Sequence, residues 1–280
     1  MTQSFKVELL HGLLAAGHRH TLAELRDATG QDEAMLADLG RHATPAERVS
    51  AALAALTLRI GGIETPAIER VLELTAGDRE RLLLALCERL LGPEIDLVAT
   101  CPSCSEVAEL SIRFADIMAK HPATTVSADP HVDLDAGGET WSARLRPPTG
   151  VDLELAARSR PHAARQLIIS CVVELTDPSA KRVVPSVLPT ACVSQVADAL
   201  LALDPAAETR IGAECPFCGQ PIDALLDGYA LLQNGFGGSH RVYDDVFRMA
   251  RAYHWSEAEI LSLPLRRRRH YLAIAGEAGP

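Results

Sequence analysis

The sequence predicts an α+β protein that is mostly helical and carries two β-hairpins, each with a Cys-Pro-x-Cys turn. Hydrophobic residues make up 48% of the 280 residues and aromatic residues only 4%. Leu and Ala therefore supply most of the apolar content, which favours helices. The two cysteine pairs, Cys101-Pro-Ser-Cys104 and Cys215-Pro-Phe-Cys218, each lie between runs that alternate apolar and polar residues as strands do.

The first region, residues 1–93, is expected to contain a possible β-hairpin followed by helices. Residues 4–28 have two interpretations, because the run after Phe5 alternates like a strand whereas Thr21 and Glu24 fit the capping box of a helix. A helix over 45–59 is predicted by Thr44 as its N-cap and Pro45 at its first position. A second helix over 78–91 is apolar on most sides, so we expect it to be the central core helix.

Four further regions follow along the chain. Residues 94–146 hold the first Cys-Pro-x-Cys hairpin, which we call the first knuckle, with an irregular stretch over 121–138 and a strand over 140–146. Residues 147–206 form a helical insertion, with helices over 151–158, 162–175 and 191–203. Residues 207–235 hold the second knuckle, and residues 236–280 form C-terminal helices. The two knuckles are therefore separated by a helical insertion.

The overall charge and the chain termini exclude several classes of protein. A formal net charge of −10 repels phosphate backbones, so we do not expect nucleic-acid binding. No apolar run approaches the roughly 20 residues that span a bilayer, and the N-terminus does not fit a signal peptide. We therefore expect a cytoplasmic protein whose cysteines stay reduced, so that paired cysteines indicate a metal site or a redox pair.

The paired cysteines predict one structural zinc ion per chain. A closed zinc site needs four ligands in tetrahedral geometry, and one Cys-x-x-Cys hairpin supplies only two. Cys101, Cys104, Cys215 and Cys218 together complete a four-thiolate, zinc-ribbon-like site. About 110 residues separate the two pairs, so the metal would join distant parts of the chain and contribute folding free energy on the order of 10 kcal/mol. The same four ligands could also be shared between two chains.

Other uses of these cysteines remain open alternatives. A thiol oxidoreductase would use one Cys-x-x-Cys pair at a helix start, and a rubredoxin-like iron site would use all four thiolates. A zinc-ribbon nucleic-acid-binding protein is the main alternative function. Catalytic zinc is disfavoured because the sequence has no His-x-Glu next to a Pro-Cys-x-x-Cys. Since no nucleophile or phosphate-loop motif is present either, we predict that the protein is not an enzyme.

The C-terminal region offers a candidate partner surface. The basic run Arg266, Arg267, Arg268 and Arg269 lies in a predicted helix and is either a solvated face or a surface that contacts a partner. Tyr253 and Trp255 precede it and extend the candidate surface. The remaining cysteines, Cys87, Cys171 and Cys192, lie in apolar helical runs and are expected in the core.

Most of the chain resembles the zinc-knuckle relatives of T4-type phage baseplate proteins, found in phage tails and contractile injection systems. Both cysteine pairs and an aromatic stretch near the C-terminus make the resemblance specific. One departure is Ser105, where relatives have Gly after the first pair. The stretches that carry the resemblance, in order, are Leu25-Arg-Asp-Ala-Thr-Gly-Gln-Asp-Glu33, Leu74-Thr-Ala-Gly-Asp-Arg-Glu-Arg-Leu-Leu-Leu-Ala-Leu86, Cys101-Pro-Ser-Cys104, Leu145-Arg-Pro-Pro-Thr-Gly150, Cys215-Pro-Phe-Cys218 and Ala252-Tyr-His-Trp-Ser-Glu-Ala-Glu-Ile-Leu261.

The resemblance implies a non-enzymatic structural or assembly component of the baseplate or hub of a contractile tail. Its expected partners are other baseplate or hub proteins, and it is expected in the cytoplasm or within a phage or phage-tail-like particle. Both a permanent component of the particle and an assembly chaperone are compatible with the resemblance. It also favours the β-hairpin interpretation of residues 4–28.

Overall fold

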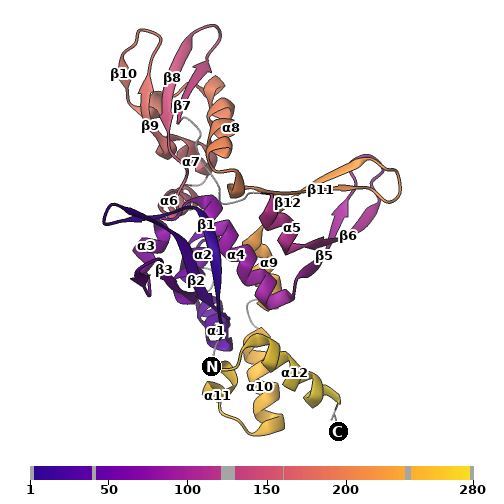
Figure 1. The fold of residues 1–280 in the computed structure, drawn as a ribbon. Helices are drawn as coiled ribbons and strands as arrows, with labels where there is room; N and C mark the ends of the chain where they lie inside the picture. Colours follow the sequence, from indigo (N-terminus) through magenta and orange to yellow (C-terminus); the bar gives the residue numbers. More distant parts are fainter. Residues whose placement is uncertain (1–2, 40–41, 121–129, 160, 237–240, 278–280) are drawn as a thin grey trace.

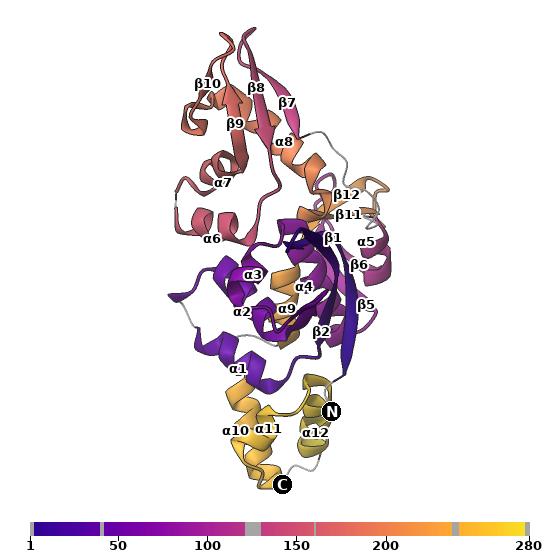
Figure 2. The same cartoon turned by 60° about the vertical axis from the view of Figure 1, so that its left-hand side comes forward.

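The structure is a computed structural model that describes residues 3–39, 42–120, 130–159, 161–236 and 241–277. Figure 1 shows a central part, a second unit above it, a lateral arm of two long hairpins, and a group of C-terminal helices below. The turned view in Figure 2 shows the same succession from the second unit down to the C-terminal helices.

The central part combines a four-stranded sheet with a buried helix. The strands pair in the order β1-β2-β3-β4, and β1 and β2 form the N-terminal hairpin. The helical alternative for residues 4–28 is therefore wrong, because β1 buries Leu9, Leu10 and Leu13 as an extended strand. The elements are β1 (Ser4–Ala15), β2 (His18–Arg26), α1 (Gly30–Asp38), α2 (Pro45–Leu56), β3 (Thr57–Ile60), β4 (Ile63–Glu64), α3 (Ile68–Leu72) and α4 (Ala76–Leu91).

Helix α4 is the core helix that its apolar sequence predicts. Its middle, from Leu82 to Cys87, is buried throughout, and it belongs to the largest apolar cluster of the structure. Helix α9 (Gly228–Phe236) packs along it and buries Leu231, Leu232 and Phe236 in the same cluster. The region after the second knuckle is thereby fixed to the first third of the chain.

The second unit contains a sheet in the order β10-β9-β8-β7 with its own apolar cluster. Two expectations are wrong here. Part of the irregular stretch predicted over 121–138 is strand β7, and residues 121–129 lie outside the described residues. The helix predicted over 162–175 ends at Cys171, because the β-branched run from Val172 pairs with β8. Its elements are β7 (His131–Asp135), β8 (Thr140–Leu145), α6 (Gly150–Arg158), α7 (Ala163–Cys171), β9 (Val172–Thr176), β10 (Arg182–Val183), short 3₁₀ turns η2 (Pro185–Val187), η3 (Thr190–Cys192) and η4 (Pro205–Ala207), and α8 (Val193–Leu203).

The arm consists of two antiparallel hairpins, each continuous with a helix of the central part. The C-terminal helices follow α9 along the chain and pack around Met249, Ile260 and Leu272. The arm elements are β5 (Glu94–Thr100), β6 (Val107–Arg113), α5 (Phe114–Ala119), β11 (Thr209–Glu214) and β12 (Pro221–Leu226), and the C-terminal helices are α10 (Arg241–Tyr253), α11 (Glu257–Leu261) and α12 (Leu265–Glu277).

The central part and the second unit, each with a four-stranded sheet, share the same connection from the second strand to the next helix. In each unit the second strand ends in Leu-Arg-x-x-Thr-Gly-x-Asp, which starts the next helix. Arg26 donates two hydrogen bonds to Asp32 at 2.6 and 2.8 Å, and Arg146 donates two to Asp152 at 2.6 and 2.8 Å. Each aspartate also accepts from the threonine at the helix start. Such bidentate, charge-assisted pairs fix the turn between strand and helix.

Each unit docks through its Thr-Gly turn onto a helix start elsewhere in the chain. In what we call the second joint, Thr149 bridges Thr75, and the Gly150 N–H donates to the Leu74 carbonyl at 3.1 Å. In the first joint, Thr29 bridges Pro264, and the Gly30 N–H donates to the Leu263 carbonyl at 3.2 Å. The second unit therefore docks onto the central part, and the central part docks onto the C-terminal helices.

A buried arginine lies under the glycine of each joint. Arg79 in α4 and Arg268 in α12 are 2% and 0% exposed, and each follows the bridging residue by the same spacing. A Cβ atom on Gly150 would collide with the Arg79 guanidinium, and one on Gly30 would collide with that of Arg268. Both positions therefore require the small residue.

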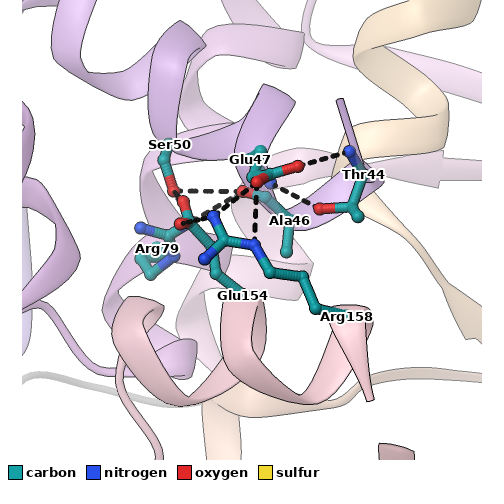
Figure 3. Close-up of polar contacts among 7 residues, drawn as sticks. All are labelled: Thr44, Ala46, Glu47, Ser50, Arg79, Glu154 and Arg158. Atoms are coloured by element: carbon teal, nitrogen blue, oxygen red, sulfur yellow. Dashed lines mark hydrogen bonds and ion pairs between the residues drawn. The ribbon is translucent and has the colours of Figure 1, made fainter. Parts of the chain in front are cut away.

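The second joint is extended by a polar network shown in Figure 3. Arg79 donates to the Ser50 hydroxyl at 2.9 Å, and Ser50 donates to Glu154 at 2.6 Å. Arg158 pairs with Glu47 beside them. Burial lowers the pKa of Arg79 to about 10, and Glu154 opposes the shift. The network joins α2, α4 and α6; its contacts are shielded from water at Arg79 and Ser50 and open to solvent at Arg158.

Candidate metal centre

The four paired cysteines meet at the tips of the two arm hairpins. Cys101 and Cys104 lie in the turn between β5 and β6, and Cys215 and Cys218 lie in the turn between β11 and β12. Both hairpins are regular antiparallel ladders that pair residue for residue up to the turn. Each Cys-Pro-x-Cys segment is therefore the turn of a β-hairpin, with the predicted strand on each side of it.

Two of the sulfur–sulfur distances match those of a tetrahedral four-thiolate site. Cys101 Sγ lies 3.7 Å from Cys218 Sγ, and Cys104 Sγ lies 3.7 Å from Cys215 Sγ. All four sulfurs lie within 4.8 Å of one another, and they form the group that could hold a metal among the described residues. Zinc–sulfur bonds of about 2.3 Å in tetrahedral geometry require sulfurs about 3.8 Å apart, so the donor set fits zinc.

The two turns have the same backbone geometry. In the first, the Ser105 N–H donates to the Cys101 carbonyl and the Cys101 N–H to the Glu106 carbonyl, both at 2.9 Å. In the second, Gly219 and Cys215 make the corresponding bonds at the same distances. Ser105 and Gly219 have φ of 63° and 72°. The serine therefore holds a left-handed conformation that glycine adopts without steric cost.

Backbone amides favour the thiolate form of the first cysteine. The N–H groups of Cys104 and Ser103 point to the sulfur of Cys101 and lower its pKa to about 6. A thiolate is the form that binds a metal ion. In the same turn the Glu106 N–H lowers the pKa of Cys104, but burial and hydrogen bonds with the other cysteine sulfurs outweigh it and raise the pKa to about 12.

A small apolar cluster packs against the sulfurs on the side of the hairpin strands. Cys101 and Cys215 are buried with Ala108 and Ile222, which come from the strands on either side. Cys218 is exposed and Cys104 is half-buried. The lining is therefore closed on the strand side and open only at the hairpin tips.

The three remaining cysteines lie in cores, as their apolar surroundings predict. Cys87, Cys171 and Cys192 are all buried, and burial raises the pKa of each thiol, to about 11 for Cys171. Neutral thiols of this kind are unreactive.

The predicted partner residues of the C-terminal region have different surroundings. Tyr253 and Trp255 stack at 5.1 Å and both contact Tyr271, so they form an aromatic cluster within the C-terminal helices. Arg266 and Arg267 are exposed. Arg269 donates to the Gly235 carbonyl of α9.

Arg268 does not belong to this surface. It is fully buried, pairs with Glu33 and with Asp245 at 3.3 Å, and lies under Gly30 in the first joint. The run of four arginines follows the helical period, so one of its members faces inward while its neighbours face the solvent.

The joint residues were missed by reasoning from the sequence. Leu25-Arg-x-x-Thr-Gly-x-Asp32 and Leu145-Arg-x-x-Thr-Gly-x-Asp152 match at five positions. A search for internal self-similarity would find them. Their function depends on which distant helix each contacts, and that information lies only in the structure.

A family model described as T4 bacteriophage base plate protein matches residues 62–229. The match covers more than half of the chain and includes both cysteine pairs, the second unit and the second joint. The chain belongs to this family. The resemblance found from the sequence is thereby confirmed. The comparisons with curated proteins and with solved structures gave no match. Among the described residues, no helix has the length and apolar character needed to cross a membrane.

Proposed function

We propose that this base plate protein is a non-enzymatic structural or assembly component of the baseplate of a contractile phage tail or phage-tail-like injection system. Membership of the base plate family supports the assignment. The observation that carries the zinc part of the proposal is the approach of four sulfurs from positions 111 and 117 residues apart to the spacing of a tetrahedral site. We assign Cys101, Cys104, Cys215 and Cys218 as ligands of one structural zinc ion.

The zinc ion would close a loop that contains the whole second unit. The first knuckle follows α4 after two residues, and the second knuckle precedes α9, which packs on α4. Lys120 also links the two sides by donating to the Arg210 carbonyl at 2.9 Å. A metal bond at the tips would therefore fix the direction of the arm and limit how far the second unit moves from the central part.

The position of the cysteine pairs does not favour the redox alternative. A low-pKa redox cysteine uses the start of a helix, and here each pair lies in a turn between two strands with no helix next to it. Four thiolates around one centre leave no open ligand position for catalysis.

Metal analysis and affinity purification test the proposal together. The purified protein is expected to hold one zinc per chain, and Cys101→Ser and Cys218→Ser are each expected to lose the metal and to lower the melting temperature. Cys87→Ser is the matched control for metal content, because Cys87 is buried away from the site. Full zinc retention in either ligand variant would contradict the shared site. Purification of the tagged protein from cells that make the particle is expected to recover baseplate or hub proteins, and their absence would contradict the assembly function.

A further inference from the structure

The two joints differ in what covers the start of the receiving helix. At the second joint the protein covers it with its own β1. The Asp78 carboxylate accepts the N–H groups of Leu10 at 2.5 Å and of Gly12 at 2.7 Å, and Arg81 donates to the Glu8 carbonyl at 3.1 Å. The irregular middle of β1 thus lies across the first turns of α4.

A second segment completes this cover. The Gly77 N–H donates to Asp204 at 2.8 Å, and a Cβ atom on Gly77 would collide with the same carboxylate. Asp204 is fully buried. Gly77, Asp78 and Arg81 of α4 are therefore all hydrogen-bonded to other segments of the same chain.

The bridges at the joints define the corresponding positions in α12. Thr75 and Pro264 both bridge the threonine of a Thr-Gly turn, and Arg79 and Arg268 occupy the same place under the glycine. Counting from these anchors, Gly77, Asp78 and Arg81 of α4 correspond to Arg266, Arg267 and His270 of α12. All three α12 residues are exposed.

The three uncovered residues line a groove of 530 Å³ between α12 and the α4–α9 pair. Its apolar lining comes from Leu86, Leu90, Leu232 and Leu265. Arg89 and Asp27 also line it, and they pair with each other at 3.0 Å. The charge of this pair cancels, so Arg266 and Arg267 give the groove a positive charge on a chain whose formal net charge is −10.

We propose that this groove binds an extended acidic segment of another baseplate protein, which lies across the start of α12 as β1 lies across the start of α4. The proposal rests on the proposed baseplate function. The change from Asp78 to Arg267 at corresponding positions reverses the polarity of the contact: the first accepts backbone N–H groups, whereas the second offers donors to carboxylates and carbonyls. Leu90 is half-buried and is the member of the apolar lining open to a side chain of the segment, since Leu86, Leu232 and Leu265 are buried.

Photo-cross-linking in the full-length protein tests the proposal. His270→p-benzoylphenylalanine, made in cells that assemble the particle, keeps both arginines and places the probe in the groove. We expect a cross-link to a segment rich in Asp and Glu in a baseplate protein. R266E/R267E is expected to reduce the cross-link about tenfold or more, since both charges then repel the segment. R70E/R113E is the matched control, because both arginines are exposed and lie elsewhere.

The outcomes separate the groove from the general function. Unchanged cross-linking in R266E/R267E, or a cross-link to nucleic acid, would overturn the groove proposal, while copurification with baseplate proteins would leave the assembly function in place. Loss of all baseplate proteins from the wild-type purification would remove both. Glutamate is favourable in the first turn of a helix, so R266E/R267E should fold, and R266Q/R267Q provides the same test without charge reversal.

Discussion

Gly30 lies directly on the guanidinium group of Arg268, and a Cβ atom there would also come within 2.9 Å of Leu261 Cα. We therefore expect Gly30→Ala to force the first joint apart and to lower the free energy of unfolding by about 2–3 kcal/mol. Hydrogen exchange should show faster exchange in α12, because the C-terminal helices dock through this contact. Denaturant unfolding gives the energy.

Gly150→Ala should have an effect of similar size at the second joint, but the faster exchange should appear in α6. Gly62→Ala is the control for both variants, since nothing lies within 4 Å of the added atom and its φ is not positive. Equal stability of Gly30→Ala and Gly62→Ala would show that the joint tolerates a side chain, contrary to the packing described.

Glu80 predicts a pH dependence of stability. Burial raises its pKa to about 7; its hydrogen bond from the Gly228 N–H opposes this shift, and Asp227 adds to it. The folded pKa lies above the unfolded value of 4.5, so this stabilisation is fully present below about pH 4.5 and is lost as the pH rises through 7. The change amounts to roughly 3 kcal/mol.

Melting temperatures between pH 4.5 and 7.5 measure this contribution. Glu80→Gln keeps the acceptor for Gly228 but does not titrate, so its stability should fall less over that range than that of the wild type. Glu73→Gln, an exposed change on the preceding turn, should follow the wild-type curve. Parallel curves for Glu80→Gln and wild type would contradict the assignment.

Ser105 predicts that the first knuckle can be stabilised. Since its φ of 63° is costly for any residue but glycine, Ser105→Gly should raise the free energy of unfolding by about 1 kcal/mol. The converse change, Gly219→Ser, should lower it by a similar amount, because the φ of 72° is strained for serine and nothing lies within 4 Å of the added Cβ atom to change that cost. Both values come from denaturant unfolding of the zinc-loaded protein, and opposite signs for the two changes are the required outcome.

Metal removal should affect the arm more than the sheets. Chelation is expected to lower the melting temperature and to speed hydrogen exchange in β5, β6, β11 and β12, because metal-binding free energy is folding free energy. Exchange in the buried middle of α4 should change least. Re-addition of zinc should restore protection, and uniform loss of protection across the chain would instead indicate that the metal supports the whole fold.

Features set by local sequence were predictable, whereas those set by distant partners were not. The knuckle hairpins follow from strand alternation around Cys-Pro-x-Cys, and α4 follows from its apolar run. Strand β9 was predicted as helix because Val172 and its neighbours are apolar in either conformation, and only pairing with β8 decides between them. Arg268 shows the same limit, since nothing in a run of four arginines marks the one that is buried against Gly30.

The first joint connects residues near the two ends of the sequence, which has a consequence for how the chain folds as it is synthesised. The N-terminal hairpin is made first, but Arg268, which pairs with Glu33, is 235 residues further along the chain. Domains usually fold as they leave the ribosome, but the first joint cannot form, and Gly30 is not covered, until α12 has been translated. A chain truncated before α12 would therefore leave the Thr29–Gly30 turn without the helix on which it docks.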